Sequence, residues 1–191
     1  MLFKRILDIL LTVMGLIVLS PLILMTYLLV KLTSRGPALY WSQRVGKQNQ
    51  LFMMPKFRSM RLGTPQIATH LMNQQSDAVS YLTPIGSFIR KTSLDELPQL
   101  WSVLKGDMSI VGPRPALFNQ EDLIAFRTEY GVHTLKPGIT GWAQINGRDE
   151  IPIPQKVTLD AYYLNHQSLW LDMKIILLTV VKVLRRDNIT H

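Results

Sequence analysis

Residues 10–30 of this 191-residue chain read LLTVMGLIVLSPLILMTYLLV and contain no charged side chain. A run of about 20 apolar residues is long enough to cross the hydrocarbon core of a bilayer. Lys4 and Arg5 precede the run, as basic residues precede the apolar core of a signal peptide. The run is too long for such a core, however, and no A-x-A-like cleavage site follows it. We therefore expect this segment to stay in the protein and to lie in a membrane.

Ser20 and Pro21 lie in the middle of the run and leave two arrangements open. Proline removes a backbone hydrogen bond and clashes with the preceding turn, so a helix broken here would enter and leave through one leaflet. Prolines also occur inside helices that span the bilayer. The positive-inside rule does not decide between the two, because basic residues flank both ends of the run: Lys4, Arg5, Lys31 and Arg35. Asp8 lies at helical spacing from Lys4 and Arg5 and is expected to pair with them.

The composition narrows the classes of partner. A net charge of +8 and a mean hydropathy of +0.13 describe a chain that is both basic and apolar. Such a chain favours anionic partners, which include nucleic acid, phosphorylated small molecules and lipid headgroups. The apolar run makes a lipid surface the first choice, and we expect no nucleic-acid partner. The chain has no cysteine, so disulfides and thiolate metal sites are excluded.

The rest of the chain predicts an α+β fold that is mostly helical. Short apolar stretches at Ala38–Trp41 and Leu51–Met54, with a turn between them, are typical of strands. Apolar residues at helical spacing predict helices over Ser93–Leu104, Asn119–Tyr130 and Ser168–Arg186. The last of these is apolar with one basic face, which is typical of a helix in the membrane interface and equally of a core helix with a solvated stripe.

No linker or repeat divides the chain after its apolar segment. At this length we expect one domain with a core of its own. The predicted organisation is therefore a membrane anchor over residues 1–36 and a cytoplasmic domain over residues 37–191.

A basic segment occurs within a long stretch that has no acidic residue, from Asp8 to Asp77. This segment, Lys56–Arg61, suits a basic rim that lies on anionic headgroups. It also suits a phosphate-binding face, because Lys56 and Arg58 flank an aromatic residue in a pattern that fits a nucleotide diphosphate. The residues alone leave both interpretations open.

One acidic pair, Asp95-Glu96, remains after the common catalytic motifs are excluded. The chain has no G-x-G-x-x-G, no P-loop, no H-E-x-x-H, no G-x-S-x-G and no Asp-x-Asp. Ser93 and Glu96 have the S-x-x-E spacing of a capping box, so Glu96 could simply cap a helix whose dipole Asp95 favours. Alternatively, Asp95 in a first helical turn is a covalent nucleophile on phosphorus. The pair would then hold Mg²⁺ through oxygen ligands.

An attack on a diphosphate also needs arginine or lysine around the phosphates. The chain offers candidates on both sides of the acidic pair, and two of them lie in turn-rich segments: Arg90, Lys91, Arg114 and Arg148.

Several segments resemble the bacterial sugar transferases, which are monotopic polyprenyl-phosphate phosphoglycosyl transferases. Three long motifs carry the resemblance, in this order: SLDELPQL (93–100), GDMSIVGPRP (106–115) and KPGITGWAQINGR (136–148). Shorter segments match as well, namely Lys4–Asp8, Ser20-Pro21, Lys56–Met60 and Leu159–Tyr163. The resemblance covers nearly the whole chain.

This resemblance implies a re-entrant helix broken at Ser20-Pro21 and a catalytic domain on the cytoplasmic face of the bacterial inner membrane. It implies that Asp95 attacks the β-phosphate of a UDP-sugar, releases UMP and passes the phospho-sugar to undecaprenyl phosphate, with Mg²⁺ held at Asp95 and Glu96. It also implies which residues form the site. Asp95 and Glu96 would be catalytic, and the phosphate-binding residues would be Lys56, Arg90, Arg114 and Arg148.

Related subgroups carry an additional multi-span N-terminal half, so the resemblance is to the minimal form of the family. We expect the sugar to be a UDP-linked N-acetyl-amino sugar and the product to enter glycoconjugate assembly. The sequence does not determine whether the chain forms a homo-oligomer. The alternative from another functional class is a non-catalytic, basic, membrane-bound scaffold, because charge and anchor suit it equally. Only the acidic pair with its arginine-bearing turns favours the enzyme.

Overall fold

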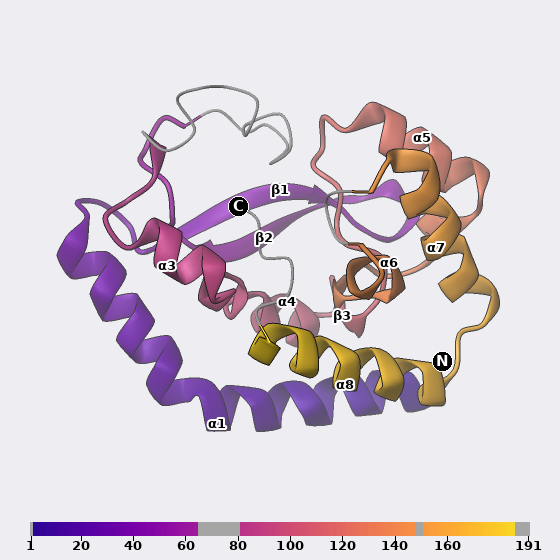
Figure 1. Ribbon diagram of the computed structural model, residues 1–191, viewed down its shortest axis with the longest axis horizontal. Coiled ribbons are helices and arrows are strands. Elements are labelled where there is room, and N and C mark those ends of the chain that lie inside the picture. The colour runs from indigo at the N-terminus through magenta and orange to yellow at the C-terminus, as the bar shows by residue number, and fades with distance from the viewer. Residues whose placement is uncertain (1, 65–80, 148–150, 186–191) are drawn as a thin grey trace.

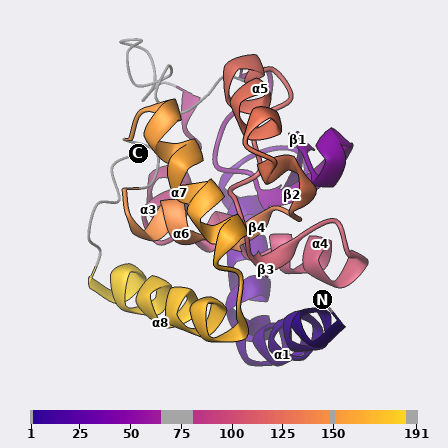
Figure 2. The ribbon, with the colours of Figure 1, turned by 90° about the vertical axis from the view of Figure 1, so that its right-hand side faces the viewer.

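The computed structural model describes residues 2–64, 81–147 and 151–185. Helices dominate these residues and the strands are short, so the expected mainly helical α+β fold is confirmed (Figures 1 and 2). The helices are α1 (Leu2–Thr33), α3 (Gly86–Lys91), α4 (Gln99–Lys105), α5 (Glu121–Glu129), α6 (Trp142–Ile145), α7 (Ile153–Asn165) and α8 (Leu169–Arg185). The strands are β1 (Leu39–Val45), β2 (Leu51–Phe57), β3 (Ser109–Val111) and β4 (Gly138–Thr140), and the 3-10 turns are η1 (Lys47–Asn49), η3 (Leu94–Glu96) and η4 (Val132–Thr134).

Strands β1 and β2 form an antiparallel hairpin in which Leu39 lies opposite Phe57 and Val45 opposite Leu51. This confirms the two strands predicted from the apolar stretches, although both extend further than predicted. Strand β2 packs against η3 and α4, so the hairpin lies directly beside the acidic pair. The short pairing of β3 with β4 is parallel and brings Ser109 next to Gly138.

The single helix predicted over Ser93–Leu104 is wrong, because this segment forms two pieces. Ser93 has φ 56° and ψ 18°, in the left-handed region, and its side chain caps nothing. The turn η3 follows, and α4 begins only after Pro98. Proline tolerates the position just before a helix but has no N–H to continue one. The capping box expected from Ser93 and Glu96 is therefore not formed.

The first turns of α1 are bound to the rest of the protein by three side chains. Arg5 donates to the carbonyls of Val103 and Leu104 at the end of α4, at 2.6 and 2.9 Å. Asp8 is buried and accepts from the Ser109 hydroxyl and the Ile110 N–H at 2.8 and 3.1 Å, while Lys4 pairs with Asp172 on α8 at 2.7 Å. The expected pairing of Asp8 with Lys4 and Arg5 is wrong, since all three have partners far along the chain.

The other end of α1 contacts the same globular part. Val30 is fully buried against Phe57 and Ile89. Just beyond the helix, buried Arg58 donates to the carbonyls of Ser34 and Arg35 at 2.9 and 2.7 Å. Both ends of a 32-residue helix are thus attached to one body.

Between its two attached ends α1 bends away from a straight line (Figure 1). Pro21 is the proline inside this helix, and it has no N–H to donate to the carbonyl four residues earlier. The Ser20 hydroxyl donates to that carbonyl, on Ile17, at 2.8 Å. The expected break is therefore a bend within one continuous helix. Its cause is the proline, and the neighbouring serine satisfies the acceptor that the proline leaves.

Helices α1 and α8 both expose apolar side chains. α1 is long and apolar enough to cross a membrane by length and composition. Its outer face includes Ile17 and Val18, which are 69% and 73% exposed. On α8, Trp170, Met173, Leu177 and Val180 are exposed at helical spacing, while Leu171 and Ile175 pack into the core. α8 is thus apolar on the face directed to the core and also on part of its outer surface.

Candidate active site

Asp95 and Glu96 lie on η3, in the connection between α3 and α4. Asp95 is buried, with 8% of its surface exposed, and Glu96 is half-buried. Asp95 does occupy a first turn, as expected, but this turn is a three-residue 3-10 turn instead of the start of a long helix. Neighbouring cations, more than a helix dipole, therefore balance the charge of this pair.

Lys56 and Arg114, two of the residues predicted to bind phosphate, both contact the acidic pair. Lys56 on β2 donates to Glu96 Oε1 at 2.9 Å, and its Nζ lies 4.0 Å from Asp95 Oδ2. Arg114, in the loop after β3, donates from Nη2 to the same Glu96 oxygen at 3.0 Å. Glu96 therefore joins two cations from segments 40 and 18 residues away along the chain.

Arg90 lies in the last turn of α3, close enough for its charge to act on Asp95. Five of the predicted site residues line one cleft of roughly 730 Å³: Lys56, Arg90, Asp95, Glu96 and Arg114. Lys91, the neighbouring candidate on α3, is exposed and does not line this cleft. The structure therefore brings together Lys56, Arg90, Asp95, Glu96 and Arg114. Arg148 lies outside the described residues, and its place in the site stays a prediction.

The pKa values of the two carboxyl groups are shifted in opposite directions. Burial raises the pKa of Asp95 to about 6, and the nearby charges of Lys56, Arg90 and Arg114 oppose that shift. Burial also acts to raise the pKa of Glu96, but Arg114 and Lys56 hold it well below its usual range. At neutral pH Glu96 is a permanent anion that holds its two cations. Asp95 is an ionised carboxylate whose protonated form is close in energy, as in many reactive groups.

A buried ion pair at the wall of the cleft supports Arg114. Arg127 on α5 donates from Nε and Nη2 to Asp160 Oδ2 on α7, at 3.0 and 2.6 Å. Its third nitrogen, Nη1, donates to the backbone carbonyl of Arg114 at 2.8 Å. Asp160 belongs to the Leu159–Tyr163 motif, but the sequence indicated no role for it, and Arg127 carried no signal at all.

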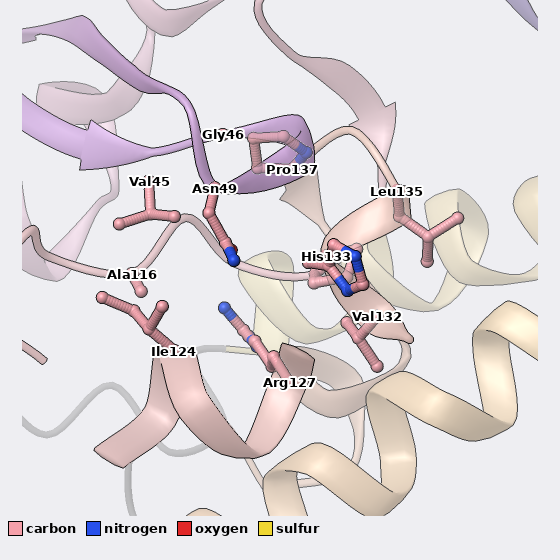
Figure 3. Close-up of a pocket in the computed structure, with 11 residues that line it drawn as sticks. Val45, Gly46, Asn49, Ala116, Ile124, Arg127, Val132, His133, Leu135 and Pro137 are labelled. Carbon is pink, nitrogen blue, oxygen red and sulfur yellow. The ribbon is translucent and has the colours of Figure 1, made fainter. Parts of the chain in front are cut away.

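A second cavity, of roughly 30 Å³, lies beside Arg127 and contains none of the predicted site residues (Figure 3). Val132, His133 and Leu135 line one side of it, and Ala116 and Ile124 another. This volume fits about one water molecule, not a substrate. Among the described residues, His133 Nδ1 is buried without a hydrogen-bond partner, which a single water in this cavity would satisfy.

The described residues contain no group of three or more histidine, cysteine, aspartate or glutamate side chains that could hold a metal ion. A fully protein-ligated metal centre is therefore not found in this part of the chain. Mg²⁺ at nucleotide sites, by contrast, commonly takes one or two carboxylates together with substrate phosphates. The Asp95-Glu96 pair fits that donor set.

The sequence of the chain matches that of a known protein family. Residues 1–186 match the sequence model described as "Bacterial sugar transferase". The chain belongs to this family. The resemblance found in the motifs is thereby confirmed, and the match extends over α1, the β1–β2 hairpin and the acidic turn.

Several relatives within the bacterial sugar transferase family have been named. The chain is 41% identical, over 97% of its length, to the undecaprenyl-phosphate galactose phosphotransferase of Salmonella typhimurium, and it spans 41% of that protein. It is 40% identical to the UDP-N-acetylgalactosamine-undecaprenyl-phosphate N-acetylgalactosaminephosphotransferase of Aeromonas hydrophila, of which it spans 43%. The uncharacterized sugar transferase EpsL of Bacillus subtilis is 41% identical, and the chain spans 91% of it. The chain thus covers about two fifths of two of these relatives and most of the third.

Proposed function

We propose that this protein transfers a phospho-sugar from a UDP-sugar to undecaprenyl phosphate and releases UMP. The observation that carries the proposal is the buried Asp95, whose pKa is raised to about 6 beside a cleft that Lys56, Arg90 and Arg114 line. Family membership supports it, since relatives are named as sugar phosphotransferases that act with undecaprenyl phosphate. The substrates of this chain are inferred from those names and from the chemistry of the cleft.

In the proposed first step, a carboxylate oxygen of Asp95 bonds to the phosphorus that carries the sugar. The bond from that phosphorus to the oxygen bridging the two phosphates breaks, and UMP leaves with the electron pair. No proton is required, because the attacking group is already ionised. Lys56 and Arg114, positioned by Glu96, lie where they can neutralise phosphate oxygens as charge develops on them.

In the second step a phosphate oxygen of the lipid attacks the same phosphorus. The bond between Asp95 and phosphorus breaks, the phospho-sugar passes to the lipid and the carboxylate is regenerated. The same cations can serve both steps because the phosphorus stays in place while the leaving group changes. This order also keeps the aqueous and the lipid substrate from having to meet in one complex.

We propose that Mg²⁺ is held at Asp95 and Glu96 together with the diphosphate, where it supplies further charge neutralisation. Both contacts of Glu96 given above involve Oε1, so Oε2 is the oxygen suited to the metal. Binding of Mn²⁺, followed by its electron paramagnetic resonance, should tighten when UDP is added and weaken in Glu96→Gln. This readout does not depend on turnover.

We infer that the sugar is an N-acetyl-amino sugar. Relatives are named for galactose and for N-acetylgalactosamine, so a panel of UDP-sugars tests this inference and the activity together. UMP release is measured with Mg²⁺ and undecaprenyl phosphate in detergent. UMP release with a UDP-linked N-acetyl-amino sugar supports the whole proposal. Release only with a different UDP-sugar would contradict the inferred identity of the sugar and leave the proposed reaction in place. No release with any sugar would favour the basic membrane scaffold.

We propose that α1 is re-entrant and that the globular part lies on the cytoplasmic face of the bacterial inner membrane. The support is geometric, because both ends of α1 are bound to the same globular part while its middle exposes apolar side chains. A helix that crossed the bilayer would place those ends on opposite sides. The exposed apolar stripe of α8 would lie in the same interface.

We expect single cysteines at the N-terminus and on the globular part to be labelled from one side. The chain has no cysteine of its own, and both Leu2 and Tyr130 are exposed, at 72% and 52%. An impermeant thiol reagent should leave both Leu2→Cys and Tyr130→Cys unlabelled in intact spheroplasts and label both after lysis. Labelling of Leu2→Cys alone in intact spheroplasts would mean that α1 spans the bilayer. Pro21→Leu restores the N–H for Ile17 and should straighten α1, which makes it the variant most prone to that result.

We expect the rate of UMP release to fall as the pH drops through about 6. Asp95 must be ionised to attack, and its pKa is raised to about 6, so kcat/KM should fall about tenfold per unit below that value. Lys56→Gln removes a cation that lowers this pKa, so its acid limb should shift to higher pH. A rate that stays constant from about pH 7.5 to about pH 5 would contradict the assignment of Asp95 as the reacting group.

Arg114→Lys should lower turnover by about tenfold or more, with the protein still folded. Arginine presents several N–H donors in a fixed plane, so Arg114 can contact Glu96 and a phosphate at once, whereas lysine has a single nitrogen. Losing one charge-assisted hydrogen bond costs about 1.5–3 kcal/mol. Arg35→Lys is a control, because Arg35 is exposed and does not line the cleft. Unchanged turnover in Arg114→Lys would limit that residue to a structural role. Arg148→Lys should behave like Arg114→Lys.

A further inference from the structure

A basic cluster outside the cleft joins three of the segments that carry the family resemblance. Arg5 belongs to the Lys4–Asp8 segment, Gly106 begins the second long motif and Lys136 begins the third. The structure brings these residues together where the N-terminal end of α1 meets the C-terminal end of α4 (Figure 2). None of the three lines the cleft that contains Asp95, so the proposed reaction gives them no role.

The side chains of Arg5 and Lys136 flank one open point beside Gly106. Gly106 follows α4 with φ 99° and has no Cβ. A Cβ placed there would lie 3.5 Å from Arg5 Nη2 and 3.7 Å from Lys136 Nζ, and apart from the chain around Gly106 no other described group lies nearer. These distances are slightly longer than an N–H···O hydrogen bond of about 2.7–3.2 Å. Both side chains would therefore need only a small movement to hold an oxygen atom at this point.

The acidic groups nearby are bound elsewhere and do not pair with these two cations. Arg5 has five N–H donors, and its contacts with the carbonyls of α4 use two of them. Lys136 is half-buried and makes no hydrogen bond or ion pair with another described residue. Asp107 pairs with Lys105 at 3.0 Å, and Asp8 accepts its hydrogen bonds from the β3 segment. Two cationic groups thus retain donors that point to no protein anion.

The positive charge of Lys136 is disfavoured in this position. Burial lowers the pKa of Lys136, and so do the charges of Arg5 and Lys47. The charges of Asp8 and Asp107 act on that pKa in the opposite direction. Cations held close together repel one another, and the repulsion is stronger where water is partly excluded. An anion bound between Arg5 and Lys136 would replace that repulsion with two attractions, and a phosphate group suits both side chains.

The neighbouring surface of α1 indicates that this phosphate belongs to a lipid. Leu2 and Ile9 lie three residues before and four residues after Arg5, on the same side of the helix. They are 72% and 37% exposed, so apolar side chains lie directly beside the cationic pair. A phospholipid presents matching groups side by side, because its anionic phosphate adjoins its acyl chains.

We infer that Arg5 and Lys136 form a second phosphate-binding site, separate from the cleft, which holds the headgroup of an anionic phospholipid. Phosphatidylglycerol has the required chemistry, since it carries one negative phosphodiester and no cation. The bound headgroup would link the first turns of α1 to α4 and to the segment before β4. The inference uses the proposed membrane position of α1 and does not depend on the proposed reaction.

Thermal unfolding in detergent micelles tests the site with phosphatidylglycerol, phosphatidylcholine and inorganic phosphate as probes. Phosphatidylglycerol should raise the Tm of the wild-type protein more than phosphatidylcholine does, and Lys136→Gln should lose that difference. Without anionic lipid, Lys136→Gln should unfold at the temperature of the wild type or above it, because a repulsion is removed. Lys136→Arg keeps the charge and should keep the response to phosphatidylglycerol. A Tm of Lys136→Gln that is lowered equally with every probe would overturn the inference, since Lys136 would then only support the end of α4.

Lys31→Gln is the matched control, because it removes one exposed positive charge at the other end of α1. Native mass spectrometry should show that Lys136→Gln binds phosphatidylglycerol about tenfold or more weakly than the wild type, as expected for one lost charge-assisted hydrogen bond. Lys31→Gln should bind it as the wild type does. Equal losses in the two variants would overturn the inference, because the lipid would then respond only to overall charge. A Tm gain from inorganic phosphate alone, lost in Lys136→Gln, would refute the lipid as the ligand of this phosphate site.

Discussion

Asp95→Asn should abolish UMP release even when no lipid acceptor is present. The substitution keeps the size of the side chain, but an amide is a poor nucleophile. Loss of a covalent nucleophile can cost on the order of 10⁶-fold in rate. The wild-type protein incubated with UDP-sugar and Mg²⁺ should gain the mass of one phospho-sugar on the peptide that contains Asp95, and the variant should gain none. Intact-protein and peptide mass spectrometry, together with UMP release, measure both results.

Glu96→Gln is the matched control, because it makes the same chemical change on the next residue. Glu96 holds Lys56 and Arg114, so the variant should react slowly but still form the adduct. UMP release that requires both substrates, with no adduct trapped, would indicate direct transfer in a ternary complex. The capping-box interpretation predicts instead a lower Tm with normal turnover per folded molecule. Since Ser93 makes no cap, we expect turnover, not Tm, to show the larger change in Asp95→Asn.

Asp160→Leu should destabilise the protein by about 3–5 kcal/mol, because it leaves the guanidinium of Arg127 buried without its anion. Asp160 is 1% exposed and Arg127 is 8% exposed, so little bulk water reaches the guanidinium that loses its partner. Burial raises the pKa of Asp160, and the charge of Arg127 opposes that shift. Thermal and urea unfolding measure the loss.

The double variant Arg127→Met/Asp160→Leu separates the cost of an unpaired charge from the value of the pair. Removing both charges should recover much of the stability lost in Asp160→Leu, because apolar replacements of a buried pair are often tolerated. Activity should not recover with it, since a methionine side chain cannot donate to the Arg114 carbonyl as Arg127 does at 2.8 Å. Recovery of both would mean that Arg127 has no positioning effect on Arg114. Lys4→Met, which breaks the pair with Asp172, should cost less stability, because the Lys4 side chain is partly exposed and Tyr163 still donates to Asp172 at 2.6 Å.

The features that depend on neighbouring residues were predictable from the sequence. The apolar run predicted α1, and short apolar stretches predicted the hairpin. Asp95 and Glu96 were identifiable as a candidate site because they are adjacent in the chain and belong to a recognisable motif. The amphipathic pattern of α8 was also readable, since a helix brings residues three and four apart onto one face.

The contacts between distant groups came from the tertiary structure alone. It assigned Asp8 to Ser109 and Ile110, and Lys4 to Asp172, where the local spacing had suggested pairing within α1. It divided the helix predicted through Pro98 and removed the expected cap at Ser93. It also brought Arg127, which lacks any motif, against Asp160 and the Arg114 carbonyl. Periodicity and capping rules describe interactions within a few residues. A charged group instead takes the partner that compensates its burial best, and the path of the whole chain determines which partner that is.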